Sequence, residues 1–224
     1  MKYEIIGGNL PAVICKLSKG EQIICEGGGM SWMDDAFTME TNGGGARKVF
    51  GKAFSGESLF NNIYTAKDDA EIAFASSFPG DILVIEVEKD KGIIAQKRSF
   101  LACEGGVEMS VYFHKKFAGG FFGGEGFIME KFSGRGLVFL EVDGSVKEYT
   151  LAPGERKVMD TGHLVMMDES CTLEVESVKG IKNKLLGGEG LFNTVVTGPG
   201  KIVLQTMPIE KTAKLISELI PSSS

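Results

Sequence analysis

Residues 185–192 read LLGGEGLF, and this stretch decides the fold because the chain contains it more than once. Residues 121–128 read FFGGEGFI, and residues 54–60 read FSGESLF, which is a weaker copy. The glutamates of the three copies are Glu57, Glu125 and Glu189, so the period is roughly 65 residues. The sequence therefore predicts three internal repeats, which we place at residues 3–76, 77–144 and 145–207.

The residues that follow each copy also repeat. Residues 132–140 read FSGRGLVFL, and residues 196–204 read VTGPGKIVL. Glu21 and Asp34 are separated by the same number of residues as Glu155 and Asp168. A unit this small does not cover its own hydrophobic face, so three copies are expected to pack about a shared core. We predict one compact domain over residues 1–224, with the repeats in a closed pseudo-threefold arrangement.

Short apolar runs separated by glycine predict that the repeats are built from antiparallel β-strands. The chain has 31 glycines in 224 residues, about twice the usual share. Runs of four to six β-branched and apolar residues lie between the glycine-rich turns. The C-terminal stretch differs, since residues 208–220 have the spacing of an amphipathic helix between Pro208 and Pro221. The expected fold is mainly β with one short C-terminal helix, which caps the β-core or an oligomer interface.

Charge and cysteine usage limit the partners and the compartment. The formal net charge is −6, which argues against a nucleic-acid partner. The four cysteines have no C-x-x-C spacing, and their apolar neighbours favour buried reduced thiols. The first residues contain no apolar signal segment, and no apolar run is long enough to span a bilayer. We expect a cytoplasmic protein.

Motifs for nucleotide binding and catalysis are incomplete. A P-loop at Gly51 and Lys52 fails because Ala46 and Ala53 replace the first glycine and the hydroxyl residue. No G-x-G-x-x-G, H-E-x-x-H or G-x-S-x-G motif is present. His163 opens an apolar strand, where a half-buried, hydrogen-bonded histidine is favoured over a metal ligand. We predict no catalytic, cofactor-binding or metal-binding residues and no cofactor.

The repeat glutamates Glu57, Glu125 and Glu189 and the histidine His163 are the remaining candidates for a site of unknown role. If the repeats converge about one axis, the three carboxylates could meet and bind a cation or share protons. The favoured alternative is that each glutamate caps its own turn by accepting backbone N–H bonds. The single tryptophan, Trp32, is interpreted as a core residue.

Several of these motifs agree in order with a known family. The Gly-Gly-Glu-Gly element, the Gly-x-Gly before an apolar strand, the PGE of residues 153–155 and the DTGHLV of residues 160–165 resemble a widespread bacterial and archaeal family. That family is related to the fungal mitochondrial proteins named for altered inheritance of mitochondria. The resemblance spans Tyr3 to about Met207. It implies repeated β-subdomains with a fold similar to the tryptophan RNA-binding attenuation protein, and it implies no catalytic residue.

Three functions stay open at this point. The favoured hypothesis is a non-catalytic binding or scaffold protein that acts as a homo-oligomer and displays its glycine-rich loops to a protein or small-molecule partner. The first alternative is an enzyme of unknown reaction with an asymmetric pocket, using His114, His163, Asp168 and Glu125. The second is a peripheral membrane protein, whose basic and aromatic loop contains Arg47, Lys48, Phe50, Lys52 and Phe54.

Overall fold

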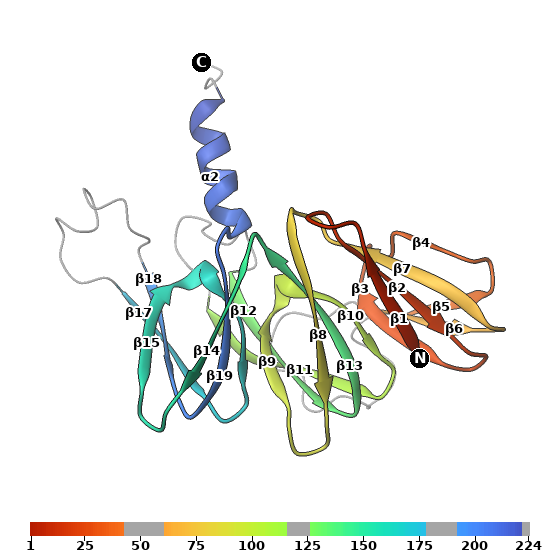
Figure 1. The fold of residues 1–224 in the computed structure, drawn as a ribbon, viewed down its shortest axis with the longest axis horizontal. Coiled ribbons are helices and arrows are strands. Elements are labelled where there is room, and N and C mark those ends of the chain that lie inside the picture. Colours follow the sequence, from red (N-terminus) through yellow and green to blue (C-terminus); the bar gives the residue numbers. More distant parts are fainter. Residues whose placement is uncertain (43–60, 116–125, 178–191, 221–224) are drawn as a thin grey trace.

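The computed structural model describes residues 1–42, 61–115, 126–177 and 192–220 (Figure 1). In these residues the chain forms antiparallel sheets and one C-terminal α-helix, so the mainly β fold with a short terminal helix is confirmed. After β1, the strands fall into three consecutive groups of six, which we call the first, second and third unit.

The strand bounds of each unit follow the same order along the chain. The first unit contains β2 (Ala12–Leu17), β3 (Gln22–Glu26), β4 (Trp32–Met33), β5 (Phe37–Asn42), β6 (Asn61–Ala66) and β7 (Ala70–Ala75), and it is preceded by β1 (Lys2–Ile6). The second contains β8 (Gly80–Val87), β9 (Ile93–Gln96), β10 (Phe100–Glu104), β11 (Val107–Lys115), β12 (Phe127–Gly134) and β13 (Gly136–Asp143). The third contains β14 (Val146–Leu151), β15 (Arg156–Asp160), β16 (Leu164–Asp168), β17 (Thr172–Ser177), β18 (Phe192–Thr197) and β19 (Gly200–Gln205).

Strand pairing inside the units is the same three times. The first and third strands of each unit pair with its sixth strand. The second and fourth strands pair with the fifth. Each unit therefore contributes three strands to one sheet and three strands to another.

Neighbouring units share their sheets. The second strand of one unit pairs antiparallel with the third strand of the next, so β3 lies beside β10 and β9 lies beside β16. The register is equivalent at both junctions, with Ala102 opposite Cys25 and Met166 opposite Ala95. Each shared sheet has six strands, half from each unit.

The units lie side by side in a row, which differs from the closed pseudo-threefold arrangement that we expected (Figure 1). Closure would pair the third unit with the first. Within the described residues, β15 and β4 instead lie at the ends of their sheets. The physical reason is the junction itself. It continues one β-sheet, whose adjacent strands rotate by only about 20–25°, whereas a threefold ring needs a much larger turn at each junction.

Three hydrophobic clusters follow the row of units. The middle cluster contains Ile24 of the first unit, Phe132 of the second and Val203 of the third, so one core crosses both junctions. All four cysteines are buried free thiols, as predicted. The prediction that Trp32 is a core residue is wrong, because this residue is 49% exposed on β4, the end strand of its sheet in the described residues.

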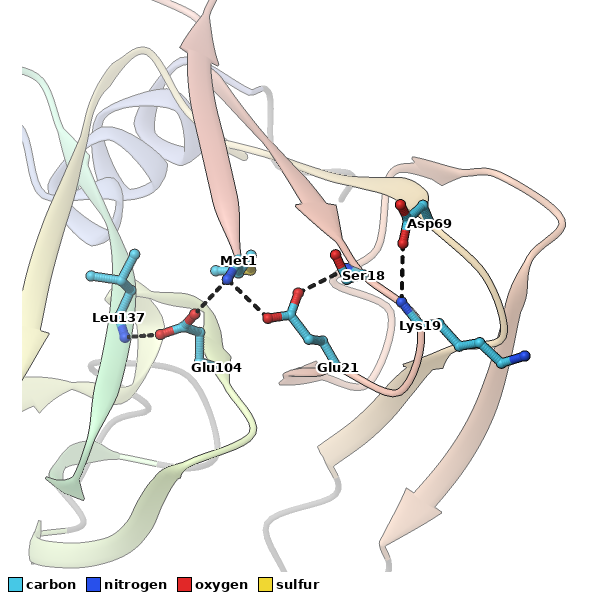
Figure 2. A network of polar contacts seen from close by, with 7 residues as sticks. All are labelled: Met1, Ser18, Lys19, Glu21, Asp69, Glu104 and Leu137. Carbon is cyan, nitrogen blue, oxygen red and sulfur yellow. Dashed lines mark hydrogen bonds and ion pairs between the residues drawn. The ribbon is translucent and has the colours of Figure 1, made fainter.

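A polar network around Met1 connects the first and second units at their junction (Figure 2). The Met1 ammonium donates to Glu21 Oε1 at 3.0 Å and lies 3.7 Å from Glu104 Oε1. Glu21 also accepts the backbone N–H of Ser18, and Glu104 accepts that of Leu137. The Glu21 contact is the main reason that the pKa of the Met1 ammonium is raised.

Helix α2 (Ile209–Leu219) begins after Pro208 and ends one residue earlier than predicted. It stands out from the sheets, and Leu215, Ile216 and Leu219 are each more than half exposed (Figure 1). The helix therefore does not cap the β-core, which was one of its two expected roles. No helix in the described part of the chain has the length and apolar character needed to cross a membrane.

Candidate functional site at the root of helix α2

The three repeat glutamates Glu57, Glu125 and Glu189 lie outside the described residues. In each unit the glutamate falls between the fourth and fifth strands in the sequence. Their convergence on a cation and their role in capping turns both stay predictions. The basic and aromatic loop from Arg47 to Phe54 also lies outside the described residues.

Other acids at equivalent positions of the three units show the role that a repeated carboxylate has in this fold. Asp34, Glu104 and Asp168 follow or end the third strand of their units. Their carboxylates accept the backbone N–H groups of residues 71, 137 and 201, at the start of the sixth strand, at 2.8, 2.8 and 2.7 Å. Glu21 and Glu155 each accept a backbone N–H three residues earlier. These repeated carboxylates satisfy main-chain donors at turns and strand ends, which is a structural role.

His163 is half-buried in the 3₁₀ turn η2 (Thr161–His163), at the root of α2. Its Nδ1 lies 2.7 Å from the carbonyl oxygen of Gln205, and its Nε2 lies 3.0 Å from Lys211 Nζ. Lys211 also pairs with Asp160, with Nζ 2.9 Å from Oδ2. Because a neutral imidazole accepts at only one ring nitrogen, this geometry fits Nδ1–H donating to the carbonyl and Nε2 accepting from lysine.

A small polar cleft lies beside this turn, where α2 meets the second and third units. It has room for about one water molecule. The lining residues come from η1 (Lys97–Ser99), the adjacent strands and the start of α2, and they are Gln96, Arg98, Ser99, Glu141, Asp143, Gln205, Ile209 and Glu210.

Asp143 is a buried acid of this cleft. Burial raises the pKa of its carboxyl from 3.8 to about 6, although the hydrogen bond from the Ile209 N–H opposes the shift. That bond is 3.0 Å long and satisfies an orphan donor in the first turn of α2. The Asp143 N–H donates to Gln205 Oε1 at 2.9 Å, and Gln205 Nε2 donates to the Gly162 carbonyl at 2.9 Å.

Glu210 lies on the first turn of α2 with both carboxylate oxygens buried. Arg98 Nη1 is 3.6 Å from Glu210 Oε1, which is an ion-pair distance but too long for a hydrogen bond. Within the described residues, neither oxygen accepts a hydrogen bond. The cleft thus brings Asp143, Glu210 and Arg98 together, and none of the three was a candidate from the sequence.

The residues named for an enzyme are only partly described, and His163 and Asp168 among them are not side by side. His163 lies in η2, just before β16, and Asp168 ends β16, so at about 3.3 Å per residue they are roughly 16 Å apart. His114 lies on β11 opposite Ile128, and Glu125 is outside the described residues. In the described ranges no three His, Cys, Asp or Glu side chains are grouped as metal ligands would be.

Residues 3–207 match the family described as Mitochondrial biogenesis AIM24. The chain belongs to the AIM24 family. This confirms the resemblance drawn from the repeated motifs. The chain is also similar to a sequence of Streptococcus pyogenes that is described as an uncharacterised protein. It is 27% identical over 224 residues, which cover 96% of this chain and 88% of the relative.

The fold of this AIM24-family chain is also similar to a crystal structure of a Streptococcus pyogenes protein. The TM-score is 0.79 at 23% sequence identity, and the similarity covers 98% of this chain and 99% of the other. The family match includes the cleft residues of the second and third units. It ends before α2, so Ile209 and Glu210 lie outside it. One signal for the missed cleft was available in the sequence. An acid in the first helical turn after a proline is a helix-start pattern, and Glu210 occupies that position.

Proposed function

We propose that this AIM24-family chain is a non-catalytic binding or scaffold protein that works as a homo-oligomer and offers helix α2 to a protein partner. The observation that carries the proposal is the exposed apolar side of α2. Leu215, Ile216 and Leu219 are 60%, 53% and 77% exposed. Their spacing places them on one side of the helix, since residues three and four apart are neighbours.

A helix of this length with an uncovered apolar side is stabilised when that side packs against a partner. Isolated helices shorter than about 12–15 residues are marginal in water, and α2 has 11 residues. Most helical stability in proteins comes from packing an apolar face, and the β-body does not cover this one. A groove that accepts an amphipathic helix recognises this pattern of side chains.

The root of α2 supports the same function. Asp143 bonds the N–H of Ile209, and Lys211 contacts both His163 and Asp160. The polar side chains of this region therefore fix the base of the helix and leave its far end exposed. This arrangement suits a projecting arm with a set direction.

Site-specific photocrosslinking tests the proposal. A photoreactive amino acid at Leu219 is expected to capture a protein in the source cells, whereas the same group at Ser217, on the opposite side of α2, is not. The captured protein is then purified and mixed with this chain. Leu215→Glu with Leu219→Glu should weaken that reconstituted complex at least tenfold, which is about 1.4 kcal/mol. The charge-matched pair Lys214→Gln with Ser217→Glu, on the opposite side of α2, should not. Equal binding by both pairs would refute a role for the apolar side.

The enzyme alternative has one observation in its favour. A carboxyl whose pKa is raised by burial, beside a second buried acid and an arginine, is typical of functional sites. Asp143, Glu210 and Arg98 form such a group. The cleft has room for about one water molecule, which is too little for a substrate without rearrangement. Native mass spectrometry decides between the two: a discrete bound small molecule that is lost in Glu210→Gln favours the enzyme.

A further inference from the structure

The junctions between units leave two incomplete sheets at the ends of the molecule. Each internal six-stranded sheet joins the fourth, fifth and second strands of one unit to the third, sixth and first strands of the next. The third unit ends in the sheet β17-β18-β15, which is the first half of this pattern. The first unit begins with β4, β7 and β2, which form the second half and carry β1 as an addition.

Pairing inside the units shows which residues correspond. Ile24, Ile94 and Val158 lie opposite equivalent positions of the fifth strand, at Ile63, Lys131 and Val195. Likewise Ala102, Met166 and Trp32 lie opposite equivalent positions of the sixth strand, at Phe139, Val203 and Ala73. The end strands β15 and β4 can therefore be compared with the strands that form the internal junctions.

Positions that are buried at both internal junctions are open at the two ends. Ile24 and Ile94 are 6% and 0% exposed, but Val158 is 58% exposed. Cys103 and Met167 are fully buried, whereas the equivalent Met33 is 38% exposed. The outer edges of β15 and β4 thus carry apolar side chains at the same positions that a neighbouring unit covers elsewhere in the chain.

We propose that β4 of a second copy pairs antiparallel with β15, so that copies of this chain join head to tail through a third junction of the same kind. The shared sheet would run β17-β18-β15 and then β4-β7-β2-β1 of the second copy. In the register of the internal junctions, Trp32 lies opposite Met159 and Met33 lies opposite Val158. This inference rests on the proposed function only in taking the protein to be a homo-oligomer.

Charge supports the pairing of these two edges with one another. The same register places Asp34 opposite Lys157 and Asp35 opposite Arg156. Directly opposite residues of an antiparallel pair have Cβ atoms about 4.5–5.5 Å apart, where opposite charges attract. The corresponding positions of the internal junctions carry no such ion pairs, since Glu104 lies opposite Ile23 and Asp168 opposite Ile93.

The two edges lie at opposite ends of the row of units, and α2 rises between these ends (Figure 1). Because the edges differ, each contact leaves one free β4 and one free β15. Such head-to-tail contacts grow until the ends meet in a ring, or continue as a filament. A symmetric dimer is not expected from this contact.

Sedimentation velocity and native mass spectrometry of the untagged full chain test the inference over about 1 to 100 µM, which brackets contacts of micromolar affinity. Wild-type protein is expected to assemble with rising concentration. Val158→Asp blocks the β15 edge and Met33→Asp blocks the β4 edge, so each variant alone should stay monomeric. Both side chains are exposed, so the variants should fold, and circular dichroism confirms that they do. Met39→Asp, on the exposed edge strand β5, is the matched control and should assemble like wild type.

An equimolar mixture of the two blocked variants gives the sharpest result. The Val158→Asp copy keeps its β4, and the Met33→Asp copy keeps its β15, so the mixture should form a one-to-one dimer that does not grow. Arg156→Asp or Asp35→Arg alone should weaken assembly about tenfold, and the two together in one chain should restore it.

Two results would overturn the inference, and they differ in what they say about the proposed function. Wild-type protein that stays monomeric at the highest concentration removes both the head-to-tail contact and the oligomeric part of the function. Assembly that persists in Val158→Asp but is lost in Leu215→Glu with Leu219→Glu places the contact on α2. The strand pairing is then wrong, while the oligomer stands.

Discussion

Replacing Asp143 by asparagine should stabilise the protein at neutral pH and have little effect at acid pH. Folding raises the pKa of this carboxyl from 3.8 to about 6, so the folded state favours the protonated form. The unfolding free energy contributed by Asp143 is therefore highest below the unfolded pKa and falls as pH rises through about 6. Asparagine cannot ionise, and its side-chain oxygen can still accept the Ile209 N–H.

The pKa shift sets the size of this effect. One pKa unit corresponds to 1.36 kcal/mol, so the shift of Asp143 corresponds to about 3 kcal/mol at most. The gain in unfolding free energy for Asp143→Asn should rise from near zero at about pH 4 to 2–3 kcal/mol, on this order of magnitude, at about pH 7.5.

Urea unfolding of both proteins over this pH range measures the difference directly. Asp168→Asn is the matched control, because its carboxylate likewise accepts one backbone N–H, from Lys201. The unfolding free energy of Asp168→Asn should decrease with rising pH as it does in the wild type, because Asp143 is still present. A difference between Asp143→Asn and wild type that does not change with pH, or a variant that is less stable at neutral pH, would refute the assignment of the raised pKa to Asp143.

Four further outcomes are expected. Phe139→Ala empties a fully buried site and should lower the unfolding free energy in urea by about 3–5 kcal/mol. Gly80→Ala would drive a Cβ into the backbone carbonyl oxygen of Val142, so a loss of about 1–3 kcal/mol is expected in the same assay. Burial raises the pKa of the Cys103 thiol, and a thiol reagent should label Cys103 only after unfolding. His163→Ala removes contacts to Gln205 and Lys211 and should speed hydrogen exchange in the first turn of α2, measured by mass spectrometry.

Local patterns predicted much of the fold. The three copies of the glycine-glutamate motif indicated three units, and the observed strand pairing repeats in the same order. The apolar spacing between Pro208 and Pro221 predicted a helix within one residue of its observed bounds. Both features depend on residues close together in sequence, where turn chemistry and side-chain periodicity act directly.

Features that depend on how the units meet could not be predicted in the same way. The spacing of the repeats does not specify the rotation between neighbouring units, so the sequence did not predict the open row. Trp32 was wrongly placed in the core, because its counterparts Ala102 and Met166 pair with the second strand of the preceding unit, whereas in the described residues β4 is an end strand. The cleft at the root of α2 joins Asp143 and Glu210 from distant segments, with no spacing that links them.

The shared sheets also affect the order in which the protein can be completed during synthesis. Because β3 must wait for β10, and β9 for β16, neither the first nor the second unit has its full set of strand partners when it leaves the ribosome. Ile24 and Ile94 stay uncovered on the nascent chain until the following unit emerges. The cooperative folding unit is therefore longer than the sequence repeat, and a truncation at a repeat boundary leaves half a sheet without its other half.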